Sequence, residues 1–306
     1  MKILVTGATG FLGSNLIPAL LERGDEVTAW RRRESDRPRL ENPRLRHAWG
    51  DLADASPENL SRLKDAMSGC QGVVHLAAKT SQDPSSRLEA DAVNIEGTER
   101  LLDCAKSSGV RRFVYASSQS AKISNPGIYG ATKKKSEELV LRSGLDAVVL
   151  RPAIIYGPGN AGIFSKFVKI VKRLPVIPVP WTEVPFQPVY VGDVVGAVLG
   201  ALDAGSHPQN VYDVAGPDPV TFPGLISRVA RTLGLTRPLI PVPMGLAILG
   251  ARLLSGIMRR PPVTVDNLIG LTESTPLDLG PMARDLKVAP MALDAGLALS
   301  LKEEIP

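Results

Sequence analysis

The stretch Lys2-Ile3-Leu4-Val5-Thr6-Gly7-Ala8-Thr9-Gly10-Phe11-Leu12-Gly13 decides the fold of this chain. Its apolar start is typical of a buried strand, and the glycine turn follows at once and opens a helix. Glycines permit a tight turn and close backbone approach, while a helix N-terminus offers free N–H groups and the positive end of its dipole. The order strand, turn, helix therefore predicts a pyrophosphate-binding turn, with contacts from Gly7, Gly10, Phe11, Leu12 and Gly13.

Short apolar runs and helical patterns alternate through the first half of the chain. Strands are predicted at Lys2–Thr6, Glu26–Trp30, Leu45–Trp49, Val73–Ala77, Arg112–Ser117 and Ala147–Leu150. Helices are predicted at Phe11–Arg23, which contains Pro18 and should kink there, and at Pro57–Met67, Arg87–Ser108 and Tyr129–Arg142. This alternation predicts an α/β fold with a doubly wound parallel sheet.

The pattern changes after about residue 155, where prolines become dense. Helices are still predicted at Ile163–Arg173, Val191–Ala204, Phe222–Leu233 and Met244–Met258, and a strand at Val211–Ala215. We expect residues 1–155 to form the dinucleotide-binding domain. Residues 156–306 should form a smaller substrate-binding region that is interleaved with it in one compact unit.

Composition excludes several classes of protein. A net charge of +5 over 306 residues is too small to indicate a nucleic-acid partner. Cys70 and Cys104 are too few for a disulfide framework and fit a reducing compartment, and with three histidines in no ligand-like spacing they predict no metal site. With neither a leader peptide nor an apolar run of about 20 residues, we expect a cytoplasmic protein without a membrane span. A homodimer is the assembly that general statistics favour.

Three arginines end the second predicted strand. Arg31-Arg32-Arg33 stands about 20 residues after the glycine turn, where an NAD site would carry an acidic residue for the ribose. Arg31 and Arg32 suit a 2′-phosphate, so NADP is the preferred cofactor, with NAD as the alternative. The run can also be read as a solvated charge cluster, and Glu34 remains able to reach a ribose. Asp51 and Leu52 end the third strand, where the carboxylate would face an adenine amino group or serve as a turn residue.

A tyrosine and a lysine four residues apart indicate the chemistry. Tyr129 and Lys133 lie on one face of a predicted helix, and the lysine charge should lower the pKa of the phenol so that it exchanges a proton with a substrate oxygen. Ser117 and Ser118 end the fifth strand, at the sheet edge where such folds bind ligands. A serine hydroxyl there can orient the same oxygen.

A family resemblance now becomes visible. It rests on Thr6 to Gly13, His75-Leu76-Ala77-Ala78, Asn94 to Thr98, Tyr115 to Ser118, Tyr129 to Lys133, Leu150-Arg151-Pro152, Tyr156 to Gly159 and Val189 to Val194. In this order the segments resemble the extended short-chain dehydrogenases/reductases, the NAD-dependent epimerase/dehydratase family. The C-terminal part, with Thr264 to Asn267 and Pro276 to Asp278, resembles the branch related to an accessory subunit of respiratory complex I.

The resemblance implies roles for particular residues. Ser118, Tyr129 and Lys133 would form the catalytic triad, with Ser117 beside the nicotinamide. Further cofactor contacts are implied for Leu76, Ala77, Ala78, Asn94, Ser117, Tyr129, Lys133, Pro152, Ile154 and Ile155, with Lys133 holding the ribose. Two features depart from the family pattern: Ala121-Lys122-Ile123 replaces the usual valine, tyrosine and glycine, and only ten residues separate Ser118 from Tyr129.

Three functions are compatible with these features. The favoured one is an NAD(P)-dependent oxidoreductase that moves a hydride between the nicotinamide and a carbonyl or secondary alcohol of a small organic substrate. The second is a nucleotide-sugar epimerase or dehydratase with tightly bound NAD, for which Asn160, Lys166, Lys169 and Arg173 would hold a diphosphate. The third is a non-catalytic nucleotide-binding assembly or regulatory protein, in which Met244–Met258 would dock on a partner or a membrane surface instead of lining a pocket or filling the core.

Overall fold

A computed structural model describes residues 1–32, 40–80, 84–159, 163–203, 205, 209–257 and 265–302. Arg33, Glu34, Asn160, Met258 and Thr264 lie outside the described residues. The chain divides into two compact units. The first comprises Met1–Pro152, Gly192–Val214 and Asp278–Ala289, and the second comprises Ala153–Val191, Ala215–Leu277 and Pro290–Pro306.

The first unit is built on a seven-stranded parallel sheet in the order β10-β6-β5-β4-β1-β2-β3. Its strands are β1 (Lys2–Thr6), β2 (Glu26–Arg31), β3 (Leu45–Trp49), β4 (Gly72–His75), β5 (Arg112–Ala116), β6 (Asp146–Pro152) and β10 (Val211–Val214). The order runs outward from β1 in both directions, as in a doubly wound fold. The predicted fold class is therefore confirmed, with strand ends shifted by one or two residues.

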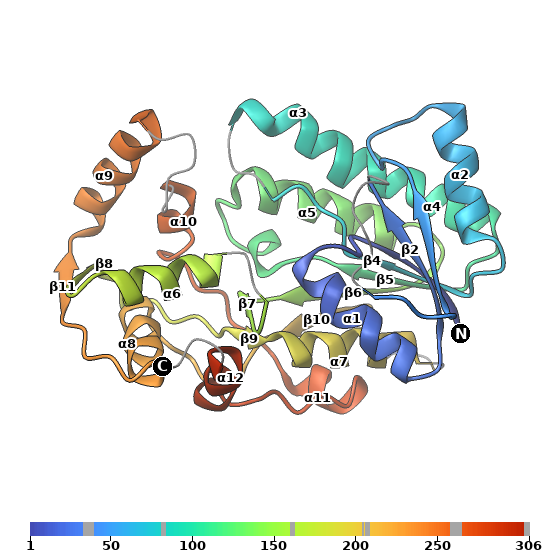
Figure 1. Ribbon diagram of the computed structural model, residues 1–306. Coiled ribbons are helices and arrows are strands. Elements are labelled where there is room, and N and C mark those ends of the chain that lie inside the picture. The colour runs from blue at the N-terminus through green and yellow to red at the C-terminus, as the bar shows by residue number, and fades with distance from the viewer. Residues whose placement is uncertain are drawn as a thin grey trace. The chain divides into compact units, whose positions relative to one another are not determined.

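Helices cover both faces of this sheet (Figure 1). One face carries α2 (Pro57–Met67), α3 (Arg87–Ala90), α4 (Gly97–Ser107) and α5 (Gly127–Leu141). The other carries α1 (Phe11–Glu22), α7 (Val191–Leu202) and α11 (Gly280–Asp285). Helix α1 continues through Pro18. The single helix predicted over residues 87–108 is interrupted by a π-helical turn, Asp91–Glu96, between α3 and α4.

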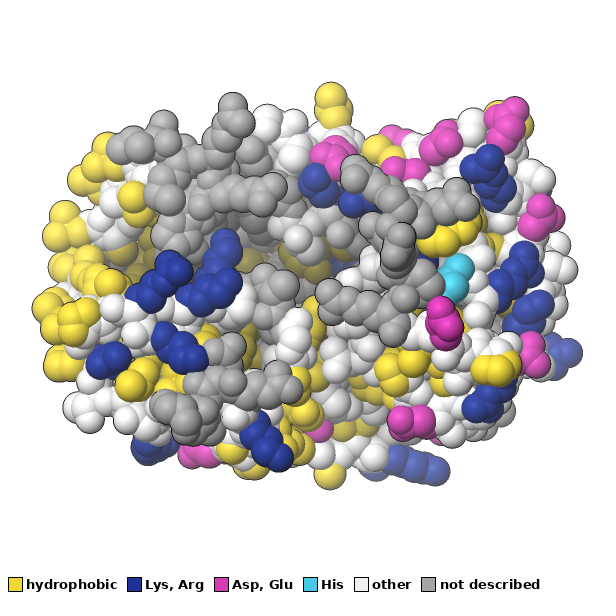
Figure 2. Space-filling view, in the orientation of Figure 1, with side chains coloured by type: hydrophobic (Ala, Val, Ile, Leu, Met, Phe, Trp, Pro, Cys, Tyr) yellow, Lys and Arg dark blue, Asp and Glu magenta, His cyan; other side chains and the backbone are white. Residues whose placement is uncertain are grey.

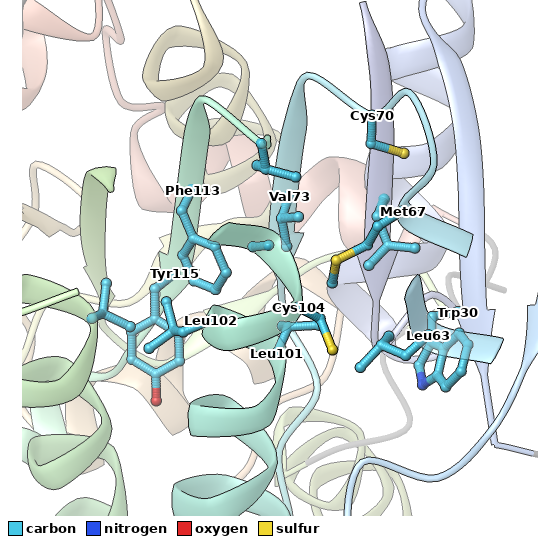
Figure 3. Close-up of a cluster of buried hydrophobic side chains, with 14 of the residues drawn as sticks. Trp30, Leu63, Met67, Cys70, Val73, Leu101, Leu102, Cys104, Phe113 and Tyr115 are labelled. Atoms are coloured by element: carbon cyan, nitrogen blue, oxygen red, sulfur yellow. The ribbon is translucent and has the colours of Figure 1, made fainter. Parts of the chain in front are cut away.

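The core of the first unit lies between the sheet and α2 and α4 (Figure 3). Phe113 and Tyr115 of β5 pack with Leu101 of α4 and Met67 of α2, and all four are 1% exposed or less. Cys70 and Cys104 belong to the same cluster as free, buried thiols, and burial raises the pKa of each. Packing in this core fixes the position of each strand in the sheet. It thereby fixes the position of the residues that follow each strand.

The second unit contains two small parallel sheets, β7 (Ile155–Tyr156) with β9 (Val189–Tyr190) and β8 (Ile177–Pro180) with β11 (Leu239–Val242). Its helices are α6 (Ile163–Arg173), α8 (Phe222–Thr232), α9 (Met244–Ile257), α10 (Val265–Ile269) and α12 (Leu293–Ser300). Side chains of α6, α8, β8 and α12 form a separate core, in which Phe167 and Phe222 stack edge to face at 5.1 Å.

Candidate active site

The glycine turn joins β1 to α1 in a geometry that other residues would not permit. Gly7 has a φ of +69°, and a Cβ there would lie 2.7 Å from the backbone nitrogen of Ala77. A Cβ on Gly13 would lie 2.3 Å from the carbonyl oxygen of Gly7. Gly10 caps α1 without a side-chain hydrogen bond, and the first turn, with Phe11 and Leu12, contains no acidic residue. The turn thus keeps backbone N–H groups and a positive helix end available for an anion.

Strand register brings the predicted cofactor residues to the same edge of the sheet. Thr6 lies opposite Trp30 of β2 and His75 of β4, so the residues after them stand level with Gly7. His75 is fully buried, with Nδ1 2.7 Å from the Thr6 hydroxyl and Nε2 3.0 Å from that of Thr98. Leu76, Ala77 and Ala78 continue from it and are half-buried beside the turn. Burial, and to a lesser extent the charge of Lys133, lowers the pKa of His75 to about 3. The His75 ring is therefore neutral and has a structural role.

Arg31 at the end of β2 carries buried polar atoms without partners. The side chain is 5% exposed, and its Nε and Nη1 make no hydrogen bond within the described residues. The guanidinium carbon stands 4.9 Å from the ring centre of Trp49. Arg32 is exposed. Unpaired buried donors are costly, and a phosphate would satisfy them.

Asp51 and Leu52 follow β3. The Asp51 carboxylate accepts the backbone N–H of Ala53 at 2.9 Å, and Asn59 brackets the Asp51 backbone with hydrogen bonds to both its N–H and its carbonyl. Asp51 therefore serves as a turn residue, which is one of the two roles that the sequence allowed; the other is a contact with adenine. Leu52 is buried, and its backbone carbonyl accepts from Arg100 at 2.8 Å.

Asn94 lies in the π-helical turn and is 2% exposed. Its side chain donates to the Lys79 carbonyl at 3.0 Å and to the Thr132 hydroxyl at 2.9 Å, and accepts from the Lys79 N–H at 2.7 Å. It therefore ties the segment after β4 to the helix that carries Tyr129. The residue predicted from the motif is at the site, with its amide engaged by the protein itself.

Ser118, Tyr129 and Lys133 come together at the ends of β5 and α5. Burial raises the pKa of Tyr129 to about 12, and a hydrogen bond with Ser118 acts in the opposite direction. The sequence predicted that Lys133 lowers the pKa of Tyr129, but the pKa is raised, because burial outweighs the hydrogen bond with Ser118. Lys133 is 1% exposed, donates to the Ala116 carbonyl at 2.5 Å and lies 4.1 Å from the ring centre of Tyr115.

The ammonium of Lys133 is held by opposing effects. Burial lowers its pKa to about 7, while the negative charge of Glu137, one turn further along α5, raises it. The hydroxyl of Ser117 donates to Glu137 and Ser117 is buried. Lys133 is buried and Tyr129 is half-buried, and the pKa values of the two groups are shifted in opposite directions. Such shifts are common where protons are exchanged.

Sequence reasoning gave no role to three residues that support this site. Glu137 is buried and paired with Arg151 at 2.5 Å. Asp213 of β10 accepts from Gln119 at 3.0 Å and from Lys122 at 2.8 Å, which anchors the short segment after Ser118. Arg151 belongs to the segment Leu150-Arg151-Pro152, which carries the family resemblance, so its role could have been predicted from the sequence. No local sequence pattern indicates a role for Asp213. Pro152 closes β6 in the first unit, and Ile154 and Ile155 belong to the second.

Comparisons with known proteins agree with this fold and show the family. A model described as "NAD dependent epimerase/dehydratase family" matches residues 3–215. Sterol demethylase protein B of Methylococcus capsulatus is 32% identical over 84% of this chain and 80% of its own. The mitochondrial NADH dehydrogenase [ubiquinone] 1 alpha subcomplex subunit 9 of Arabidopsis thaliana is 33% identical over 71% of this chain and 54% of its own.

A solved structure extends the likeness of fold to nearly the whole chain. The UDP-glucose 4-epimerase of Thermotoga maritima with UDP-glucose superimposes with a TM-score of 0.75, at 23% identity, over 99% of this chain and 98% of that one.

Proposed function

The chain belongs to the NAD dependent epimerase/dehydratase family, and we propose that it is a reductase or dehydrogenase acting on a carbonyl or secondary alcohol through Ser118, Tyr129 and Lys133. The observation that carries the proposal is the hydrogen bond between Ser118 and Tyr129, with the buried Lys133 one turn along α5. Tyr129 would exchange the proton with the substrate oxygen, and Ser118 would hold that oxygen.

The cofactor site fits a dinucleotide. Gly7 and Gly13 let the turn pack closely against the backbone of Ala77 and of the turn itself, where a Cβ would collide. The first turn of α1 would then offer its free N–H groups to a pyrophosphate. A bound nicotinamide cofactor supplies the acceptor or donor of the hydride. Ser117, Leu76, Ala77 and Ala78 would line it at the carboxyl ends of β4 and β5.

We further propose that the cofactor is NADP. Its support is Arg31, which stands one strand from the glycine turn with two buried donors unsatisfied, and the exposed Arg32 beside it. A 2′-phosphate is the group that charge-assisted hydrogen bonds from a guanidinium would hold best.

A substitution tests the catalytic assignment. Tyr129→Phe should lower kcat roughly 100- to 10,000-fold, since general acid–base catalysis contributes about this much, and should leave NADPH affinity nearly unchanged. Tyr212→Phe in β10 is the matched control and should turn over normally. Carbonyl compounds, including sterols as the name of the Methylococcus relative suggests, are the substrates to screen. Preserved turnover in Tyr129→Phe contradicts the proposed mechanism.

The family also contains enzymes that recycle the hydride. If NAD stays bound after purification and a UDP-sugar is epimerised without net change in NAD absorbance, the epimerase function replaces the one proposed. If NADPH and NADH bind but no substrate reacts, a non-catalytic role replaces the proposed function.

A further inference from the structure

Helix α9 has an apolar side turned outward. Leu246, Leu249 and Leu253 are 61%, 53% and 62% exposed, and their spacing of three and four residues puts them on one face. On the packed side of the same helix Ala251 is 3% exposed, and Ala247 and Ile248 are half-buried. An ordinary surface helix packs most of its larger apolar side chains inward, whereas these three leucines face outward.

The apolar side continues onto the small sheet from which α9 emerges. Ile240 of β11 is 53% exposed, and its register partner Pro178 of β8 is exposed with it. Trp181, just after β8, is 51% exposed. Of thirteen large hydrophobic side chains exposed in the described part of the chain, eight lie between Leu174 and Leu254. Figure 2 shows hydrophobic side chains gathered over α9 and β11.

Cations border this apolar surface. Lys166, Lys169 and Arg173 share the exposed face of α6, whose opposite face is buried through Phe167 and Val171. Arg252 is exposed on α9. Figure 2 shows lysine and arginine side chains over α6, beside the hydrophobic ones and on the same face of the molecule.

Acidic residues are missing from the segments that build this surface. The sequence contains no Asp or Glu from 147 to 182, which spans α6 and β8, or from 219 to 265, which spans β11 and α9. The charged side chains that these segments contribute are therefore all cationic, although the whole chain carries only +5. A cluster of cations favours an anionic partner.

We propose that the surface formed by Trp181, Ile240, Leu246, Leu249 and Leu253, with the cations of α6, docks on an anionic phospholipid bilayer. Leucines on an outward helix face enter the boundary of the acyl chains, a tryptophan suits the headgroup level, and lysines and arginines pair with lipid phosphates. Within the described residues no helix is long and apolar enough to cross a bilayer, so α9 would lie in the plane of the interface. The docking is separate from the proposed oxidoreductase function.

Vesicle sedimentation of the full chain tests the proposal. Vesicles of phosphatidylcholine with 30% phosphatidylglycerol (about one anionic lipid in three) should bind the protein, pure phosphatidylcholine should bind it at least about tenfold less, and raised salt should release it. Leu249→Ser with Leu253→Ser should weaken binding about tenfold or more. Leu88→Ser, at an 83% exposed leucine of α3, is the matched control and should bind as the parent does.

A charge series separates the electrostatic contribution from the apolar one. Lys166→Glu with Lys169→Glu should weaken binding about tenfold, while Lys134→Glu with Lys135→Glu, the same charge change on the exposed face of α5, should have little effect. Urea unfolding establishes that each variant is folded.

Three outcomes would overturn the proposal: no binding to anionic vesicles, equal binding by the two-leucine variant, or self-association that this variant abolishes in a protein that ignores vesicles. The last would assign the surface to a second copy of the chain.

Discussion

Arg151 in β6 donates to the carboxylate of Glu137 on α5 from Nε at 3.0 and 3.1 Å and from Nη2 at 2.5 Å. The same carboxylate accepts from Ser117 after β5. Because Glu137 follows Lys133 by one turn, a single buried carboxylate joins two strands to the helix that carries Tyr129 and Lys133. It also provides the negative charge that opposes the loss of the proton from Lys133.

Glu137→Gln should lower the pKa of Lys133 below its value of about 7, because the charge that raises it is removed. The ammonium would then lose its proton at a lower pH, and an NMR titration of the lysine amines should show the shift. Stability should fall by roughly 3 kcal/mol, since a buried ion pair loses one partner. Glu138→Gln, at the exposed neighbour, is the control. An unchanged titration of Lys133 would disprove the electrostatic role of Glu137.

Gly13→Ala should destabilise the protein by about 3 kcal/mol or more and abolish nucleotide binding. The new Cβ would lie 2.3 Å from the Gly7 carbonyl oxygen and 2.8 Å from the Ala8 Cα, and both are backbone atoms that cannot yield without moving the turn. Gly245→Ala in α9 meets nothing within 4 Å and should gain up to about 1 kcal/mol. Urea unfolding measures both, and equal effects would refute the close approach of α1 to the turn.

Arg31→Ala should weaken NADPH binding about 10- to 100-fold and leave NADH binding nearly unchanged, since charge-assisted hydrogen bonds contribute about 1.5–3 kcal/mol. Fluorescence titration of cofactor-stripped protein measures both affinities. Arg46→Ala, at an exposed position of β3, should change neither. A parent protein that prefers NADH would show that Arg31 does not select the cofactor.

Acidification should destabilise the protein through His75. Its pKa is about 3 in the folded chain against 6.5 in the unfolded one, so between these values only the unfolded chain takes up the proton. The free energy of unfolding should therefore fall by about 1.4 kcal/mol for each pH unit below 6.5 from this group alone. His75→Asn should remove that part of the slope. The pKa of His47 is also lowered, by burial and by the charge of Arg31, so His47→Asn should remove a separate part and leave that of His75 in place. The test is urea unfolding at pH 7 and pH 5, and parallel slopes in parent and His75→Asn would exclude this histidine as the cause.

Local patterns were sufficient to predict the strands of the first unit. The strands β1 to β6 can be predicted because a strand that is buried on both faces requires a run of apolar residues. The glycine turn can be predicted because a φ of +69° at Gly7 restricts which residues can occupy that position. The short strands β7, β8, β9 and β11 were not predicted. These strands contain only two to four residues, some of them proline, which is too short for a recognisable pattern of apolar residues. Each pairs with a strand more than 30 residues away in the sequence.

The sequence by itself determined that Gly7, Arg31 and Ser118 stand at the carboxyl ends of strands of one parallel sheet, and that Tyr129 and Lys133 share one helix. Only the tertiary structure decided the pKa values of these residues and the ion pairs and hydrogen bonds that hold them in place. The pKa of Tyr129 is set by burial, and the Glu137–Arg151 pair is formed by register between α5 and β6. It decided likewise that the leucines of α9 face outward, because composition fixes how apolar a helix is, while packing alone selects which side is covered.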